Sequence, residues 1–401
     1  MAEPLDFERL LQGCRDESFD DGLLIETELV PVAGIGAPVK PAVYEGGRYQ
    51  RDRRWASPED AEPQDVIVVD NVPSQANRLE EQLRRARERC GLPEIVLDLS
   101  DMDWMPAHLP RQLSSFQFPH RNADAYLRDA LLDGQPFDKT DLGQAIFGAT
   151  PWEAGALVSW FPQALLYGFW QSHLGKKRQQ TKHARAWISE IVGWQPGPGA
   201  DETTRSLGLK GDPLNLSIDE TALFDAKDQA GWRLGEKPEK GEDKKKLSEL
   251  GHGQVPFMSD GDAAPAGVSF RRLTQKVSLS FAQLRRVYMG IGSHQADAAA
   301  RALIVSIGIH AHVMAFGRGF ALRSGAELRP MDVSATWLSS TGDSSVGLGS
   351  SESTEELVML AKDAARAASV PLDGWDQEPL RLQAKDALRK AIQATWPNLD
   401  A

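Results

Sequence analysis

The sequence of 401 residues predicts an α+β protein whose strands form a sheet with helices on one face. Three observations support this fold class. Residues 23–30 alternate side chains with a period of two, which is typical of a strand. Residues 66–70, "VIVVD", form an apolar run that leads directly into a helical pattern. Another apolar run, residues 95–99, follows that helix, and helices and strands recur later in the chain.

The first third of the chain is predicted to contain two helices between strands. A short amphipathic helix is expected near residues 5–13, and residues 34–63, rich in Gly, Pro and charge, are expected to be a long connection. In the helix that follows residue 70, Leu79, Leu83, Ala86 and Cys90 fall on one face, and Gly91 ends it. These four residues are therefore predicted to be core.

The remaining segments of the sequence have less regular patterns. Residues 152–170 are expected to be a buried helix interrupted at Pro162, whereas residues 181–194 fit a helix or a strand equally well. Strands are expected within 267–281, 316–330 and 331–338, a helix at 295–315, a flexible loop at 341–353, and two alanine-rich helices at the end. We divide the chain into a first part, 1–195, an inserted excursion, 196–264, further strands and a helix, 265–340, and a helical extension, 341–401.

The composition favours a cytoplasmic protein without a membrane partner. Two cysteines, Cys14 and Cys90, provide neither a disulfide framework nor a zinc site. The N-terminal segment has no apolar signal region. The formal net charge of −12 argues against generic coating by nucleic acid, but it leaves room for a local basic groove.

The candidates for catalysis are few. Asp98, Asp101 and Asp103 lie close together in "DLSDMDW", as a divalent-metal or acid–base site requires, although an acidic loop after a strand explains them more simply. His310 and His312 would point to opposite sides of a helix, so they do not suit one metal ion. The sequence contains no common catalytic motif, and we expect neither a catalytic residue nor a metal or other cofactor.

Two basic stretches without acidic residues stand out in this acidic chain. They are residues 176–185, "KKRQQTKHAR", which follow several aromatic side chains, and residues 271–286, "RRLTQKVSLSFAQLRR". Each alone could be a solvated face. Together they are typical of a groove that follows a single-stranded backbone and stacks bases.

The helix start in "NVPSQANRLE" is a possible anion site. Ser74 could cap the helix, and the guanidinium of Arg78 could take a phosphate with two hydrogen bonds. Alternatively, Asn77 satisfies the turn and Arg78 pairs with Glu81. The residues alone leave both interpretations open.

Two motifs resemble the backbone subunit of type I-G CRISPR effector complexes, a member of the RAMP superfamily. "VDNVPSQANRLE" is similar to a D-S-x-Q-S-x-A-N-R-x-E pattern, with Asn71 and Pro73 in place of Ser and Gln. "LLYGFWQSHLGKKRQQTKHARAWISEIVG" resembles the second motif. The matching positions are Asp70, Ser74, Ala76, Asn77, Arg78 and Glu80 in the first, and Gly168, Trp170, Ser172, Gly175, Lys176, Arg185, Ser189, Glu190, Ile191, Val192 and Gly193 in the second.

This resemblance implies a modified RRM-like (ferredoxin-like) palm with an inserted thumb or hairpin and helical additions. It also implies a non-catalytic subunit that polymerises along a guide RNA (crRNA) and presents it for pairing with target DNA, so that base pairing carries the sequence specificity. The implied partners are further copies of the chain, the other subunits of the effector complex and a recruited helicase–nuclease.

The residues predicted to bind RNA fall into three groups along the chain. They are Ser74, Gln75, Asn77 and Arg78; Ser172, His173, Lys176, Lys177, Arg178, Lys182 and Arg185; and Arg271, Arg272 and Lys276. The alternative is a RAMP-type endoribonuclease that uses a metal at Asp98, Asp101 or Asp103, or works without a metal through His173 or His183.

Overall fold

The computed structural model describes residues 3–44, 48–171, 181–197, 221–225, 232–235, 237–247, 249–250 and 267–396, and it confirms an α+β protein. The helices are α1 (Phe7–Gly13), α2 (Val72–Cys90), α3 (Ala125–Arg128), α4 (Asp141–Gly148), α5 (Gly155–Trp160), α6 (Pro162–Tyr167), α7 (Phe281–Leu284), α8 (His294–Phe316), α9 (Ser351–Ala367) and α10 (Asp386–Thr395). Short 3₁₀ turns lie at Ser115–Gln117, Arg121–Ala123 and Phe137–Lys139.

The strands are distributed over the whole chain. In order they are β1 (Glu3–Pro4), β2 (Asp20–Pro31), β3 (Val43–Tyr44), β4 (Arg48–Tyr49), β5 (Arg51–Arg54), β6 (Gln64–Asp70), β7 (Ile95–Asp98), β8 (Gln112–Ser114), β9 (Ala130–Leu132), β10 (Gln135–Pro136), β11 (Phe169–Gln171), β12 (Thr181–His183), β13 (Trp187–Pro196), β14 (Thr221–Asp225), β15 (Trp232–Leu234), β16 (Glu242–Lys246), β17 (Phe270–Ser280), β18 (Phe320–Ala321), β19 (Glu327–Ser339), β20 (Ser344–Gly347) and β21 (Leu380–Ala384).

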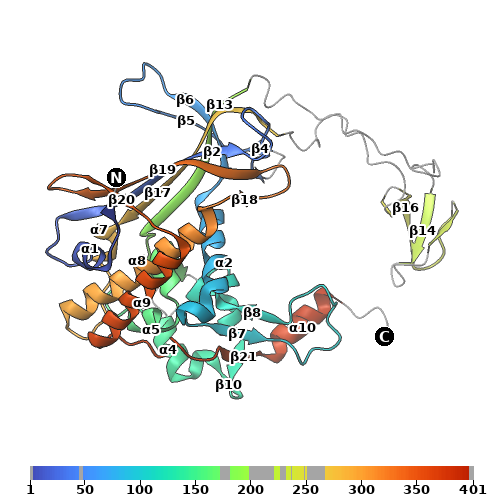
Figure 1. Ribbon diagram of the computed structural model, residues 1–401. Helices are drawn as coiled ribbons and strands as arrows, with labels where there is room; N and C mark the ends of the chain where they lie inside the picture. The colour runs from blue at the N-terminus through green and yellow to red at the C-terminus, as the bar shows by residue number, and fades with distance from the viewer. Residues whose placement is uncertain are drawn as a thin grey trace. The chain divides into compact units, whose positions relative to one another are not determined.

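The largest sheet has nine strands in the order β1-β20-β19-β2-β17-β13-β6-β5, with β18 paired to β19 (Figure 1). Its four long central strands, β19, β2, β17 and β13, are antiparallel to their neighbours throughout. The predicted period-two strand is β2, which places Leu23 and Ile25 in the core, and Val277 and Leu279 lie opposite them on β17. The sheet therefore has one apolar face.

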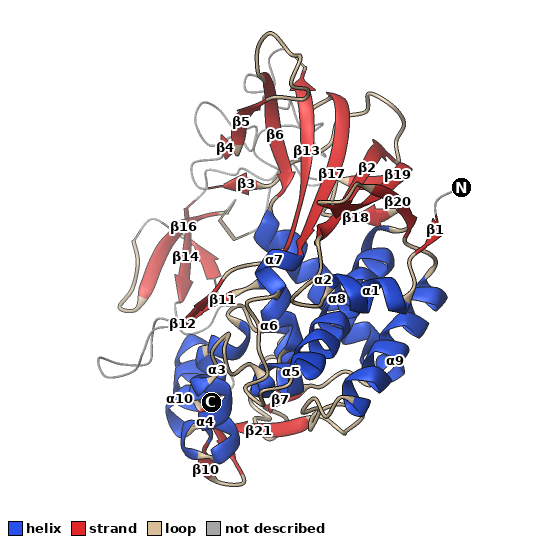
Figure 2. Ribbon diagram, turned by 90° about the vertical axis from the view of Figure 1, so that its left-hand side faces the viewer, coloured by secondary structure: helices blue, strands red, loops and turns tan. Residues whose placement is uncertain are grey.

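Helices α2 and α8 pack on that face (Figure 2). On α2, Gln75 reaches Ser189 of β13. On α8, Gly308 lies so close to β13 that an added Cβ would stand 3.1 Å from the Trp187 ring. A larger residue at position 308 would therefore require the facing side chains to shift.

A second sheet has the order β10-β9-β21-β7-β8. Strand β7, the apolar run after α2, joins this sheet and pairs in parallel with β21, near the end of the chain. The sequence led us to expect one sheet, because pairing between segments that lie 285 positions apart leaves no local pattern. The predicted helical extension 341–401 likewise contains a strand between its two helices.

Several local predictions are confirmed. The helix that follows residue 70 ends at Gly91 with a φ of 64°, and its four predicted core residues are fully buried. Pro162 begins α6 directly after α5, which confirms the interruption. The ambiguous segment 181–194 forms strands β12 and β13.

Two predicted loops contain short strands. Residues 34–63 include β3, β4 and β5; the charged sequence of β5 shows no alternation, since β5 lies at the edge of the sheet and pairs only with β6. Residues 341–353 include β20, which pairs with both β19 and β1. The sequence signal of a strand is weak where only a few residues are buried.

The chain divides into two compact units. The first comprises residues 1–42, 49–198 and 267–392, and the second comprises residues 43–48, 199–266 and 393–401. Within the second unit, β14 pairs with β15 on one side and β16 on the other, both antiparallel. Arg233 of β15 forms ion pairs with Glu239 and Glu242. This small sheet lies within the predicted excursion 196–264.

Helix α8 is the one helix in the described ranges whose length and hydropathy would allow it to cross a membrane. Of the apolar 18-residue stretch in this helix, 83% is buried inside the protein, as in the core helix of a soluble protein. Cys14 and Cys90 are both free and buried.

Candidate nucleic-acid interface

Asp70, the last residue of β6, organises the start of α2. Its carboxylate is fully buried and accepts hydrogen bonds from Ser74 (2.9 Å), Gln75 (2.6 Å) and the Nε of Arg78 (2.9 Å). Arg323, which follows β18, donates a further bond to it over 2.9 Å. Two guanidinium groups thus share one carboxylate, and the cluster keeps an excess positive charge.

The cap of α2 differs from the prediction. Asn71, not Ser74, is the N-cap residue, and its side chain accepts a bond from the Ser74 amide over 3.1 Å. Ser74 lies within the first turn and uses its hydroxyl to hold Asp70. Asn71 stands where the family pattern has Ser, and both residue types cap helices well.

Gln75 is the predicted RNA ligand with the least access to solvent. Its side chain is fully buried, donates to Asp70, and accepts bonds from Ser189 (2.8 Å) and Gln275 (2.7 Å). It therefore joins α2 to β13 and β17 and faces the interior.

Arg78 pairs with Asp70, so the alternative in which it pairs with Glu81 is wrong. Its guanidinium also donates to the Leu322 carbonyl over 3.0 Å. Glu81 instead receives bonds from Arg84 and Arg85. Asn77 is exposed and makes no side-chain hydrogen bond within the described residues.

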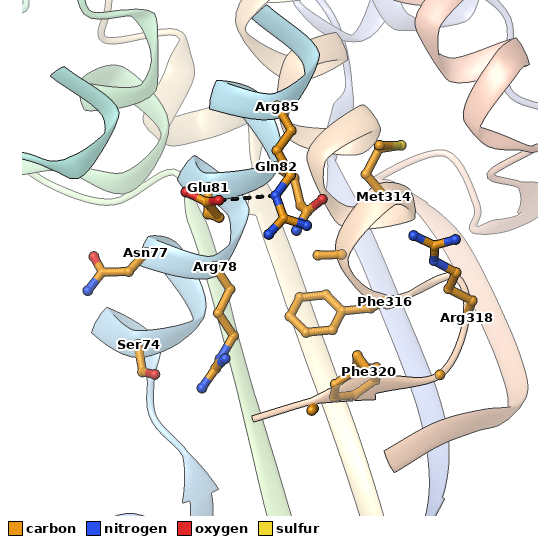
Figure 3. A pocket seen from close by; sticks show the side chains of 13 residues that line it. Ser74, Asn77, Arg78, Glu81, Gln82, Arg85, Met314, Phe316, Arg318 and Phe320 are labelled. Carbon is orange, nitrogen blue, oxygen red and sulfur yellow. Dashed lines mark hydrogen bonds and ion pairs between the residues drawn. The ribbon is translucent and has the colours of Figure 1, made fainter. Parts of the chain in front are cut away.

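A pocket of about 520 Å³ opens between α2 and the end of α8 (Figure 3). Ser74, Asn77 and Arg78 lie on the α2 side, with the α2 residues of the next two turns. The opposite wall comes from the end of α8 and the "GRGF" segment that leads into β18, including Arg318 and Phe320. The sequence predicted that the helix ends near residue 315 and that a strand follows within 316–330, but the distance of this segment from α2 along the chain hides the contact.

A buried ion pair connects the two sequence motifs. Glu80, in the first motif, accepts two bonds from Arg121, 2.7 and 2.8 Å long. Arg121 also donates to the carbonyl of Gly168, in the second motif, over 3.0 Å. Gly168 has a φ of 75°, and an added Cβ would lie 2.8 Å from the His183 carbonyl. The position therefore requires glycine.

A second pocket, of about 710 Å³, lies beside this ion pair. Strands β11 and β12 form part of its lining and place Trp170 directly across from Lys182. The Trp170 side chain is 61% exposed, and Lys182 is exposed. An accessible indole beside an ammonium group can stack a base and attract a phosphate.

Two aromatic rings of this pocket pack on each other. Phe169 stacks on His183 with ring centroids 5.9 Å apart, and the His183 ring bonds to the Leu165 carbonyl over 3.0 Å. Burial lowers the pKa of His183. Arg185 also lines the pocket, is exposed, and forms no ion pair within the described residues. Two exposed cations, Lys182 and Arg185, thus line the pocket together with the stacked rings of Phe169 and His183.

The third predicted group lines neither pocket. On β17, Arg272 lies over the Trp194 ring at 5.2 Å, and Lys276 forms an ion pair of 2.7 Å with Glu26 of β2. Arg271 is exposed and unpaired within the described chain. The predicted Ser172, His173, Lys176, Lys177 and Arg178 lie outside the described residues.

Two of the three carboxylates in the alternative endoribonuclease form ion pairs with arginines. Asp98 pairs with Arg381 over 2.9 Å and Asp101 with Arg389 over 2.6 Å, whereas Asp103 is exposed. Over the described ranges, no three His, Cys, Asp or Glu side chains are grouped to hold a metal ion. His310 and His312 are both buried on α8, and burial lowers the pKa of His312 to about 4.

The segment that carries most of β2, all of α2 and the motif residues of both pockets is similar to a known protein family. Residues 23–196 match the family described as CRISPR-associated protein GSU0053. The match confirms the family resemblance that the two motifs indicated, and a role in a CRISPR system follows from it. No curated protein is significantly similar to the chain.

Proposed function

We propose that this protein is a non-catalytic guide-RNA-binding subunit of a CRISPR effector complex. One observation carries the proposal: Trp170, Lys182 and Arg185 are exposed and line one pocket, and Trp170 lies directly across from Lys182 in the β11–β12 pair. Guide RNA is single-stranded where it awaits a target, and such strands bind to cations that alternate with aromatic surfaces.

The fold supports the RRM-like palm in this proposal. Strand β2 leads through α2 to β13, and β17 leads through α8 to β19. The spatial order β19-β2-β17-β13 is the four-one-three-two order of ferredoxin-like βαββαβ folds, with β6 added at the edge beside β13. The three-stranded sheet of β14, β15 and β16 is a suitable thumb.

The motif residues divide into two kinds, and this division supports an external ligand. Asp70, Glu80 and Gly168 bond to other parts of the chain. Asn77 and Arg185 are exposed and unpaired within the described chain. A partner outside the chain gives both of them a function.

A backbone subunit would also bind further copies of itself, the other subunits of the complex and, through the guide, the target DNA. Cleavage would belong to a separate nuclease, and the site of action would be the cytoplasm. The ion pairs of Asp98 and Asp101 favour a structural role for these carboxylates.

Direct RNA binding tests the proposal. Fluorescence anisotropy with a labelled single-stranded RNA should show binding to the wild-type protein and at least a tenfold weaker affinity for the Lys182→Ala/Arg185→Ala variant. Arg15→Ala is the matched control, because Arg15 is exposed, unpaired within the described chain, and lines neither pocket. Equal affinity in all three proteins would refute the site.

The same RNA tests for catalysis. Incubation with the wild-type protein, with and without Mg²⁺, should leave the RNA intact on a denaturing gel. Cleavage that disappears in Asp101→Ala or His183→Gln would instead support the endoribonuclease.

A further inference from the structure

The pocket between α2 and β18 has an accessible cation that the sequence did not single out. Of the thirteen lining residues, three are arginines and one is a glutamate. Arg78 is held by Asp70 and by the Leu322 carbonyl, and Arg85 is paired with Glu81 at 3.0 Å. Arg318 is exposed and forms neither a hydrogen bond nor an ion pair with the described part of the chain.

The backbone presents Arg318 to the pocket. Helix α8 ends at Phe316, and Gly317 and Gly319 flank the arginine before β18 begins at Phe320. An added Cβ at Gly319 would meet no atom closer than 3.8 Å, so space remains beside this segment. The arginine thus lies on a narrow, open turn at the rim (Figure 3).

An aromatic pair lies next to Arg318. Phe316 and Phe320 meet edge to face, with ring centroids 5.0 Å apart. Phe316 is almost fully buried, whereas Phe320 is partly exposed and lines the pocket. Because the buried ring fixes the partly exposed ring, Phe320 offers a rigid face for a planar group.

The arginine side chains determine the electrostatic character of this pocket. The start of α2 brings a partial positive charge and the end of α8 a partial negative charge, each about half an elementary charge, so the two helix dipoles offset each other. The arginines outnumber the single glutamate that lines the same space. The pocket therefore favours an anion.

We propose that this pocket binds one nucleotide of single-stranded RNA, with Arg318 as the ligand of its phosphate and Phe320 as the surface for its base. Arg78 is then a positioning residue that keeps the α2 wall in place through Asp70. This inference rests on the proposed RNA-binding function, and it moves the phosphate contact from α2 to the other wall of the pocket.

Two substitutions of Arg318 test the phosphate contact. Arg318→Ala and Arg318→Gln should each weaken the binding of a labelled single-stranded RNA about tenfold, with an unchanged melting temperature, because the side chain supports no other described residue. Arg15→Ala, a second exposed arginine near the opposite end of α8, should bind as the wild type does. Wild-type affinity in either Arg318 variant overturns the inference.

The base contact has its own readout. An RNA that carries 5-iodouridine should crosslink under ultraviolet light to a peptide containing Phe320, and Phe320→Leu should abolish that crosslink. A crosslink that persists in Phe320→Leu, or that never includes this peptide, overturns the assignment.

These outcomes separate the inference from the proposed function. If the Arg318 variants bind normally while Lys182→Ala/Arg185→Ala does not, the RNA-binding function stands and this nucleotide site is wrong. If the wild-type protein binds no RNA, the proposed function itself fails.

Discussion

Glu80 and Arg121 form a bidentate ion pair in the protein interior, with 97% of the glutamate side chain and 90% of the arginine side chain removed from solvent. The pair fastens α2 to the segment that carries Gly168, so it holds the two motif regions together. This buried pair is tolerated only with both partners present, because removing one partner leaves the other charge without compensation.

Glu80→Gln should therefore lower the free energy of unfolding by about 3–5 kcal/mol. The double variant Glu80→Leu/Arg121→Met should lose much less, because it leaves no buried charge unpaired. Urea denaturation followed by circular dichroism measures both. A single variant as stable as the wild type would show that the pair contributes little.

Gly91→Ala should destabilise the protein by about 1–3 kcal/mol or more, since a non-glycine residue is strained at a φ of 64°. An added Cβ would also stand 1.8 Å from the Asp376 carboxylate, which holds the buried Lys362. Gly148→Ala is the control, because no atom lies within 4 Å of its added Cβ. Thermal unfolding should show a lower melting temperature for the first variant alone.

Stability should fall as the pH decreases from about 6.5 towards 4. Burial depresses the pKa of His312 to about 4, so the unfolded chain, with a usual histidine pKa near 6.5, takes up the proton first. Above pH 6.5, the neutral His312 therefore adds about 3 kcal/mol to the free energy of unfolding. This contribution is lost as the pH falls towards 4. His183 and His310 also have lowered pKa values and act in the same direction.

Chemical denaturation across that pH range tests this contribution. His312→Leu should have a shallower dependence of the unfolding free energy on pH, since it no longer titrates. A slope identical to that of the wild type would show that His312 takes no part.

The salt dependence of RNA binding should report the number of phosphate contacts. For single strands, each contact contributes a slope of about −0.7 to the plot of log affinity against log salt concentration. Lys182→Ala/Arg185→Ala should make this slope shallower by about 1.4. Trp170→Ala should weaken binding without changing the slope, because stacking releases no counterions. An unchanged slope in the double variant would place the phosphates elsewhere.

Local sequence patterns predicted the regular helices and strands, but they did not predict the contacts between them. The alternation in β2 and the spacing of Leu79 and Leu83 on α2 depend only on which side faces the core, so the sequence reveals both. A basic stretch next to aromatic residues was also visible in the sequence, and in the structure Trp170, Lys182 and Arg185 line one pocket.

The helix start was harder to interpret from sequence. Gln75 and Arg78 are polar and follow a strand, as ligands of a phosphate would, but their partners are within the protein. One partner of the same cluster, Arg323, lies 253 residues after Asp70. A polar side chain can bond to a ligand or to a distant segment of its own chain, and only the tertiary structure distinguishes these cases.

Strand β21 lies between β9 and β7 in the second sheet, although it follows both of them by many residues along the chain. During translation, the edges of β7 and β9 that pair with β21 remain unpaired until residues 380–384 leave the ribosome. Such edges attract other strands, so this interval exposes the nascent chain to aggregation. A protein truncated before residue 380 would retain the residues of every strand of its main sheet and of both pockets, yet it would lack the strand that joins the two halves of the second sheet.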